Sequence, residues 1–368
     1  MKVGILTFHR ATNYGAILQA YALLKFLQTQ GHDVKIIDYK PKGMSSLYAP
    51  INVPGIKNKI KRIVLNLLML PSLKSRCLRR KMFWDYINTF LPLTERIYAS
   101  SSLPAMDAFI VGSDQVWSTC FTGGIDPLYW GQFDRKRARL ISYAGSAAED
   151  MENSFYTNDN AKLLKTFDYI SVRERELKQY LQKQSLGKDI VQVTDPTLMA
   201  GAELFHDLIA NKSPLSKPYL LIYQVIRTKD AFIQEYAKQI ASCKEWDIVE
   251  IKNTRLYIWS KNKLSVSKNL QNPSDFVNLF KYAQYVITTS FHGTAFALMF
   301  NRPFNVVSIS EEVDSRAKNI LGQLNLNDRL ITLPSVKEQK EIDWGLINQK
   351  LAELRIPSRM FLQKALTQ

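Results

Sequence analysis

Short apolar runs alternate with amphipathic stretches through the first half of the chain. Apolar runs rich in β-branched and aromatic residues predict strands at 2–8, 34–39, 108–111, 140–143, 169–172 and 190–193. Apolar residues at helical spacing predict a helix over 14–30, which Gly31 ends, and charged residues predict another over 173–184. Strands that alternate with helices indicate an α/β fold with a parallel sheet.

A second series of the same kind follows a polar stretch with two prolines at 211–218, which we interpret as a linker. Its expected elements are a strand at 219–223, a helix around 230–242, strands near Ile248 and Val286, a helix after His292 and a strand at 304–309. Residues 344–366 favour helices that cross back to the first domain.

The length of 368 residues exceeds one typical core, so we expect two doubly wound, Rossmann-like domains. The first is expected over 1–210, with a basic helical insertion at about 40–105. The second is expected over 211–345, and a C-terminal helix over 346–368 is expected to pack on the first.

Positive charge is concentrated in one interval. The chain carries a net charge of +16, yet no Asp or Glu occurs between Tyr39 and Trp84. Lysines and arginines alternate there with apolar residues, so residues 56–84 have two interpretations: amphipathic helices on an anionic membrane, or a solvated face packed on its own domain. The charge alone also suggests nucleic-acid binding, but no sequence signature of that class is present, and we expect no such partner.

The cysteines favour a reducing compartment, because Cys77, Cys120 and Cys243 are odd in number and far apart. We find no signal peptide, and the longest apolar run, near 63–70, is far shorter than the ~20 residues of a membrane span. We therefore expect a cytoplasmic protein, at the inner membrane face if the basic interval binds lipid. No residue cluster has metal-ligand spacing, so no metal is expected.

Polar residues follow the predicted strands, where α/β folds bind ligands. These strand-end residues are Asn13 and Gly15, Asp114, Gly145 and Ser146, Arg173, and Asp195. Asp114 suits a sugar hydroxyl, and the planar fork of Arg173 suits a carboxylate or phosphate. Structural alternatives are a helix cap for Asn13, an Asx-type turn for Asp114, close packing for Gly145, a salt bridge to Glu176 for Arg173, and a turn before proline for Asp195.

His292 is one of four histidines, and it follows a strand that ends in small hydroxyl residues. A strand–turn–helix at this point places the unbonded N–H groups of a helix start beside an imidazole. Ser290, Gly293 and Thr294 belong to the same turn. That pairing suits an anionic substrate that needs a proton moved. The alternative is a buried structural histidine. Arg316 follows the next strand and is placed to face the same site, or else is a surface arginine.

Seven segments in this order resemble the polysaccharide pyruvyl transferase family: NYGAILQA (13–20), GSDQVW (112–117), SYAGS (142–146), SVRE (171–174), DPTL (195–198), TSFHG (289–293) and DSR (314–316). The resemblance implies a glycosyltransferase-B-like pair of domains and phosphoenolpyruvate as donor substrate, without a further cofactor. It implies a sugar of a cell-surface glycan as acceptor, for which a lipid-linked form is one candidate.

The resemblance also implies roles for residues. His292 would be the acid/base, Arg173 would hold the donor, and Asp114 and Asn13 would orient hydroxyls. The other candidate substrate-binding residues are Gly15, Gly145, Ser146, Asp195, Ser290, Gly293, Thr294 and Arg316. One departure is Ser290, where many members carry arginine two residues before the histidine, so an anion grip must come from the helix start, Arg173 or Arg316.

A nucleotide-sugar-dependent glycosyltransferase of the same fold is the main alternative. Many such enzymes hold the nucleotide with two glutamates eight positions apart, but Asn319 and Ile320 occupy the positions that would pair with Glu311 and Glu312. A sugar-binding protein without turnover is a third possibility, and it fits His292 poorly.

Overall fold

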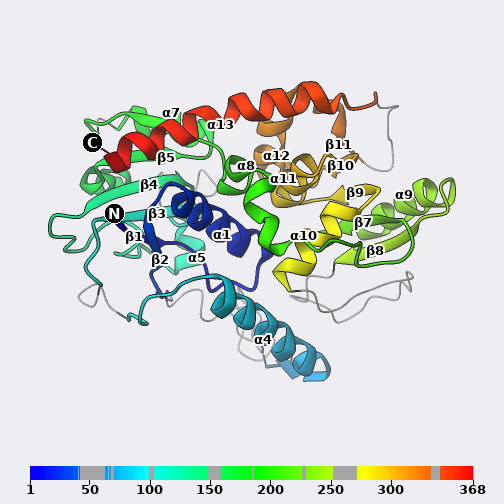
Figure 1. The fold of residues 1–368 in the computed structure, drawn as a ribbon, viewed down its shortest axis with the longest axis horizontal. Coiled ribbons are helices and arrows are strands. Elements are labelled where there is room, and N and C mark those ends of the chain that lie inside the picture. The colour runs from blue at the N-terminus through cyan, green and yellow to red at the C-terminus, as the bar shows by residue number, and fades with distance from the viewer. Residues whose placement is uncertain are drawn as a thin grey trace. The chain divides into compact units, whose positions relative to one another are not determined.

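The computed structural model describes residues 1–39, 41, 63–64, 66–67, 70–98, 103–147, 159–184, 186–225, 229–251, 272–332 and 340–367. The chain divides into two compact units. The first unit consists of Met1–Leu67, Phe83–Ala200 and Glu353–Gln368, and the second of Leu68–Met82 and Gly201–Ala352. Each unit contains its own parallel sheet with helices, which confirms the predicted fold class (Figure 1).

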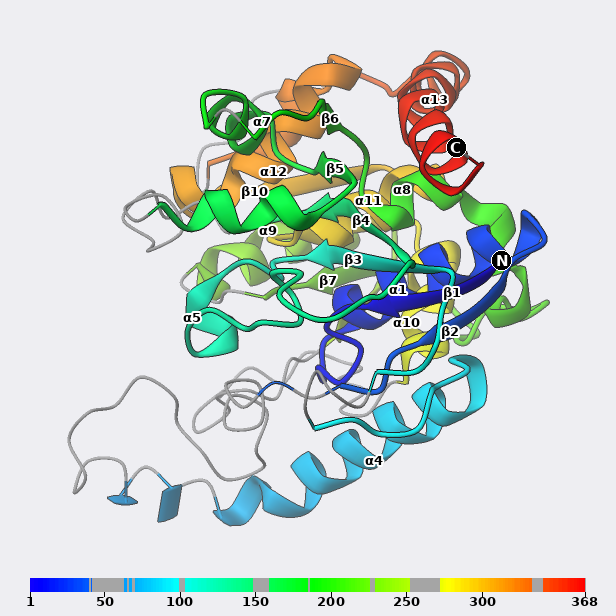
Figure 2. The same ribbon diagram turned by 90° about the vertical axis from the view of Figure 1, so that its left-hand side faces the viewer.

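The sheet of the first unit has six strands in the order β2-β1-β3-β4-β5-β6 (Figure 2). They are β1 (Lys2–Leu6), β2 (Asp33–Ile36), β3 (Ala108–Asp114), β4 (Arg139–Gly145), β5 (Tyr169–Val172) and β6 (Ile190–Gln192). Every neighbouring pair is parallel. All six strands were predicted, and β5 agrees residue for residue. Strands β1, β3 and β4 are almost continuously buried, as helix-covered parallel strands are.

Helix α1 (Tyr14–Thr29) is the long helix of the first unit and agrees with the prediction to within one residue. It packs on β2, β3 and the short helix α8 (Pro196–Ala200). Helix α7 (Arg175–Gln182) packs on β5 and β6. The shorter elements are α5 (Thr119–Thr122) and η3 (Asp159–Thr166). Because α1 is buried on nearly all sides, its amphipathic signal is weak and its sequence is mostly apolar.

The chain ends in one helix, α13 (Trp344–Thr367), which contains Pro357, whereas the sequence suggested more than one helix. Its residues from 353 onward belong to the first unit. There Arg355 Nε donates to the carbonyl of Leu198 at 2.8 Å, and the ring of Phe361 lies 6.4 Å from that of Tyr143. The Ser358 hydroxyl also accepts a hydrogen bond from the backbone N–H of Thr194.

The second unit has five parallel strands in the order β11-β10-β9-β7-β8. They are β7 (Tyr219–Tyr223), β8 (Asp247–Ile251), β9 (Tyr285–Thr288), β10 (Phe304–Val307) and β11 (Leu330–Ile331). The helices are η4 (Ala202–Leu208), α9 (Asp230–Ser242), α10 (Pro273–Tyr282), α11 (Phe291–Met299), α12 (Glu311–Leu324) and η6 (Asn327–Arg329). The predictions of β7 and α9 are confirmed, whereas α10, α12 and β11 were not predicted.

The basic interval is described only in part. A short turn, η1 (Leu70–Ser72), leads into helix α4 (Leu73–Phe90). The end of α4 packs on α1, with Phe83 against Tyr14 at 5.0 Å between ring centroids and Phe90 against Tyr21 at 6.4 Å. The predicted helix ahead of α4 lies largely outside the described residues. No helix within the described ranges is both long and apolar enough to cross a bilayer.

Both sheets reverse their direction of winding at the first strand. Strand β1 lies between β2 and β3, and β7 lies between β8 and β9. In open α/β sheets, ligands bind outside the carboxyl ends of the strands at such a switch point. The residues after β1 and β3 in the first unit, and after β7 and β9 in the second, are therefore the first places to look for a site.

Candidate active site

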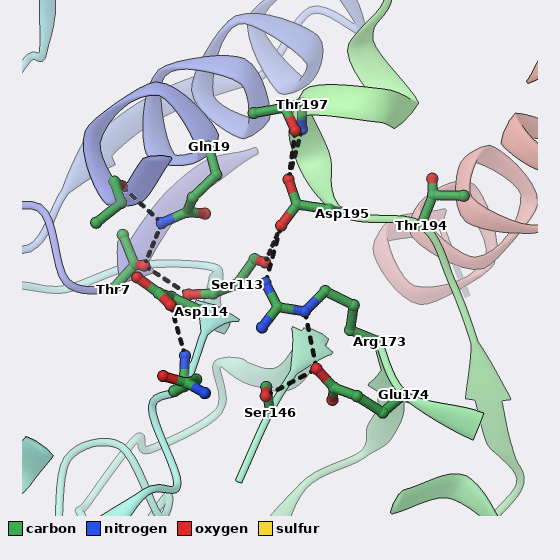
Figure 3. A network of polar contacts seen from close by, with 12 residues as sticks. Thr7, Gln19, Ser113, Asp114, Ser146, Arg173, Glu174, Thr194, Asp195 and Thr197 are labelled. Carbon is green, nitrogen blue, oxygen red and sulfur yellow. Dashed lines mark hydrogen bonds and ion pairs between the residues drawn. The ribbon is translucent and has the colours of Figure 1, made fainter. Parts of the chain in front are cut away.

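A buried polar network joins the residues that follow four strands of the first unit (Figure 3). Arg173 lies at its centre, where Nε donates to Glu174 Oε1 at 2.9 Å and Nη1 donates to Asp195 Oδ2 at 3.0 Å. The Ser146 hydroxyl donates to the same Glu174 oxygen at 2.9 Å. The Ser113 hydroxyl donates more weakly to Asp195 Oδ2 at 3.4 Å. The network thus ties together the carboxyl ends of β3, β4, β5 and β6.

The charge of Arg173 is compensated inside this network. Burial lowers the pKa of Arg173, but the carboxylates of Glu174, Asp195 and Asp114 outweigh it and raise that pKa above its ordinary value. The partners are Glu174 and Asp195, where the sequence suggested Glu176. A further anion at this guanidinium would meet two carboxylates already bound to it, so the contacts of Arg173 are those of an organising residue.

The two aspartates have local roles as well. Asp195 Oδ1 accepts from the backbone N–H and the hydroxyl of Thr197, at 3.0 and 2.7 Å, and so starts α8. Asp114 Oδ1 accepts from the backbone N–H of the next residue, Gln115, at 2.9 Å, whereas the Asx-type turn considered from the sequence would bond two residues on. Asp114 is partly exposed, and its φ of 87° lies in the left-handed region.

The end of β1 joins the network through Thr7. The Thr7 hydroxyl donates to the carbonyl of Ser113 at 2.8 Å and accepts from Gln19 Nε2 at 2.8 Å, which connects β1, β3 and α1 at the switch point. Asn13 caps α1, because its side-chain oxygen accepts from the backbone N–H of Ala16 at 3.4 Å. Gly15 is buried in the first turn of that helix.

Packing accounts for Gly145. A Cβ at this position would lie 2.6 Å from the indole of Trp117. That indole is fixed by a hydrogen bond from its N–H to the carbonyl of Tyr129 at 2.9 Å. The small residue is therefore required by the core, which is the close-packing alternative drawn from the sequence.

His292 is the second residue of α11, so the helix includes the histidine and does not start after it. The side chain is 9% exposed, and its ring lies edge-on to Phe291 with 5.3 Å between centroids. Its Nε2 atom is enclosed by protein. The guanidinium carbon of Arg316 lies 5.9 Å from the centre of the Phe291 ring, so Arg316 belongs to the same surroundings.

The start of α11 is held tightly to the end of β9. A Cβ at Gly293 would lie 2.1 Å from Thr288 Oγ1, so only glycine permits this approach. Thr288 Oγ1 donates to the carbonyl of Tyr223 at 2.8 Å, and Thr294 Oγ1 donates to that of Ser290 at 3.1 Å. Packing and local hydrogen bonds thus account for Gly293 and Thr294. Ser290 occupies the N-cap position, but its side chain makes no capping hydrogen bond.

A second buried ionic cluster was missed by the sequence analysis. Arg10 binds Asp38 through both Nε and Nη2, His9 Nε2 lies 3.1 Å from the same carboxylate, and Arg10 stacks on Trp84 at 4.1 Å. Burial alone would raise the pKa of Asp38, but the hydrogen bonds from His9 and Arg10 hold it well below its usual range. All three polar residues follow β1 or β2, so the strand-end rule would have found them. In the described ranges, no group of three or more His, Cys, Asp or Glu is arranged to bind a metal.

A family model for polysaccharide pyruvyl transferases matches residues 13–311. The sequence matches no curated protein with significance. Among solved structures, UDP-N-acetylglucosamine 2-epimerase from Rickettsia bellii is 12% identical with a TM-score of 0.51, over 100% of this chain and 96% of that one. The UDP-GlcNAc 2-epimerase from Methanocaldococcus jannaschii is 12% identical with a TM-score of 0.49, over 96% and 91%. A glycosyltransferase from Streptomyces nogalater is 12% identical with a TM-score of 0.40, over 99% and 98%. At such identities the first likeness supports the glycosyltransferase-B-like fold alone.

Proposed function

The chain belongs to the polysaccharide pyruvyl transferase family and is a transferase, and from that premise we propose its donor and product. The donor is phosphoenolpyruvate, and the product is a cyclic pyruvate ketal on two hydroxyls of a sugar in a cell-surface polysaccharide. The observation that carries the proposal is the family match over 13–311, a range that includes the switch-point residues of both units.

The chemistry requires protons to move at two places. Phosphoenolpyruvate is electron-rich at C3, and protonation there makes C2 electrophilic. One sugar hydroxyl adds to C2, phosphate departs, and a second hydroxyl closes the ketal. A positioned acid or base typically contributes ~10²–10⁴-fold to each such step.

We assign the protonation of C3 to His292. It follows β9 at the switch point of the second unit and begins the first turn of α11. With 9% of its surface exposed, the imidazole is shielded from bulk water, which limits loss of its proton to solvent. Imidazole is also the side chain suited to proton transfer near neutral pH.

We assign the donor's anionic groups to the start of α11 and to Arg316. The N-cap side chain of Ser290 does not cap the helix, and helix N–H groups with the helix dipole favour anions. Arg316 lies beside Phe291, next to His292. Arg173 was the other candidate for this task, but its pairing with Glu174 and Asp195 favours a role in holding the first-unit network.

We also propose contact between the basic interval and an anionic membrane, as a lipid-linked acceptor would require. Within the described part of 56–84, apolar side chains are exposed at Ile63, Val64, Leu67, Leu70 and Leu78. Lys74 and Lys81 are exposed on α4, and no acidic residue occurs from Tyr39 to Trp84. Exposed apolar groups flanked by lysines are typical of helices that lie in a lipid interface.

The His292 assignment is tested by H292Q, with H206Q as the matched control. His206 lies in the same unit, but its side chain is 74% exposed. We expect H292Q to abolish phosphate release from phosphoenolpyruvate plus acceptor, while its circular dichroism and unfolding midpoint stay near wild type. H206Q should turn over normally. Normal turnover by H292Q would end the assignment.

The donor is tested by thermal shift with phosphoenolpyruvate and a panel of nucleotide sugars. We expect stabilisation by phosphoenolpyruvate, followed by detection of added pyruvate on lipid-linked sugars by mass spectrometry. Stabilisation by a nucleotide sugar alone, with no pyruvate transfer, would replace the proposal by the glycosyltransferase alternative.

A further inference from the structure

Three carboxylates interact with Arg173, and they differ in access. Asp195 is buried, and both of its oxygens accept hydrogen bonds. Glu174 Oε1 accepts from Arg173 and Ser146, and its Oε2 is enclosed by protein. Asp114 is partly exposed, and only its Oδ1 accepts a hydrogen bond from the described residues. Its Oδ2 is not among the enclosed atoms, so Asp114 is the carboxylate of the three that a ligand can reach.

Asp114 also occupies the position where the fold directs ligands. It is the last residue of β3, directly after Ser113, whose carbonyl accepts from Thr7 at the end of β1. The two strands are neighbours at the switch point of the first unit. Figure 3 shows Asp114 at the border of the network, beside Ser113 and Thr7.

The backbone at Asp114 is strained for a side chain. Its φ of 87° is a conformation that glycine adopts freely and that costs other residues of order 1–3 kcal/mol. The hydrogen bond to Gln115 N offsets this by about 0.5–1.5 kcal/mol. Residues held in such conformations cluster at functional sites.

The carboxylate is coupled to the network beneath it. Burial lowers the pKa of Arg173. The charges of Glu174, Asp195 and then Asp114, in decreasing order, raise it above its ordinary value. The guanidinium is held in place by two other carboxylates, those of Glu174 and Asp195.

We propose that Asp114 is the general base that accepts the proton of the attacking acceptor hydroxyl. This assignment rests on the proposed pyruvyl transfer and adds a catalytic residue to it. The hydroxyl O–H bond breaks as its proton passes to Asp114, the oxygen bonds to C2, and the C2=C3 electron pair takes a proton from the acid of the reaction. Phosphate then leaves with the C2–O electron pair and takes the proton from Asp114. The second hydroxyl adds to C2 and returns its proton to that acid, so both groups are restored.

The assignment is tested with D114N, D114G and the control D134N. Asparagine tolerates a left-handed φ and keeps the oxygen that accepts from Gln115, so D114N removes the basic oxygen alone. We expect phosphate release to fall ~10²–10⁴-fold while the affinity for phosphoenolpyruvate is unchanged. Asp134 also binds a nearby backbone N–H, with its Oδ1 accepting from Lys136 N, two residues on, at 2.9 Å, and D134N should keep the wild-type rate.

D114G separates catalysis from structure. Glycine relieves the backbone strain, so its unfolding midpoint should equal or exceed that of wild type while the rate falls as in D114N. Added formate should restore part of the D114G rate, because a small carboxylate can replace the missing base.

The outcomes are distinguishable. A D114N rate equal to wild type overturns this assignment and leaves the donor proposal standing. A loss of rate that follows a lower unfolding midpoint in D114G, without rescue by formate, assigns Asp114 a structural role and also overturns it. A wild-type chain that releases no phosphate with any acceptor in the panel overturns the donor proposal, and this assignment with it.

Discussion

Replacing Arg173 by methionine should destabilise the protein strongly, because two buried carboxylates lose their counter-charge. The side chains of Arg173, Glu174 and Asp195 are 4%, 10% and 0% exposed, so water screens the pairs little. Methionine keeps the long apolar stem and fills much of the same space, which limits the contribution of a cavity. Removing one partner of a buried ion pair costs about 3–5 kcal/mol, and that is the loss we expect in the free energy of unfolding.

The pH dependence of this loss has a definite sign. Burial lowers the pKa of Arg173, but its carboxylate neighbours raise it above the ordinary value, so the wild-type guanidinium stays charged at every pH used for unfolding. In R173M the two buried carboxylates have no counter-charge, and only protonation removes the free-energy penalty of burying their charge. The loss should therefore be complete near neutral pH and shrink as the pH falls toward the range where carboxylates protonate, about pH 4–5.

Urea unfolding of wild type and R173M at about pH 7.5 and pH 5 measures both effects. Arg135 and Asp168 provide the control, since their side chains are 28% and 34% exposed. R135M should therefore cost no more than ~1 kcal/mol. The double variant R173M/D195N should recover part of the loss. The reasoning fails if R173M costs no more than R135M, or if its cost is the same at both pH values.

Two further outcomes follow from the second unit and the basic interval. G293A should lower the free energy of unfolding by about 1–3 kcal/mol, because its methyl group would lie 2.1 Å from Thr288 Oγ1. The control G322A, whose added Cβ would have its nearest atom at 3.7 Å, should be neutral or stabilising. Urea unfolding measures both. Binding to vesicles that contain phosphatidylserine should weaken steeply with salt, as measured by co-sedimentation, and K74E/K81E should bind them more weakly than wild type at low salt. Binding that does not change with salt would contradict the membrane proposal.

The sheets were predictable because a parallel strand that is buried on both faces has a nearly continuous apolar sequence. Strand β5 and helix α9 agree with the prediction residue for residue. Helix α10 was missed although its signal is present: Asn272 and Asp275 form a capping box around Pro273 at the first turn. The reason is that its apolar residues are partly consecutive, so the helical period is hard to separate from that of a buried strand.

The positions of site residues were predictable, but their partners were not. A strand end can be read from one segment, whereas the pairing of Arg173 with Asp195, or of Arg10 with Asp38, depends on which strands become neighbours. Gly145 shows the same limit, because the ring that excludes a side chain there belongs to Trp117, on a different loop. These pairs depend on the order of the strands in the sheet, and that order cannot be predicted from the sequence of either segment alone.

The two proposed proton-transfer groups have surroundings that suit different steps. A proton delivered to carbon must not be lost to water first, and the imidazole of His292 is almost enclosed at the start of α11. A base that takes a proton from a sugar hydroxyl must be accessible to a ligand that enters from solvent. Asp114, at the end of β3, is partly exposed, and its Oδ1 is the oxygen that accepts from Gln115. Asp114 ends the strand beside the first strand of its sheet, and His292 follows the strand beside the first strand of the other sheet.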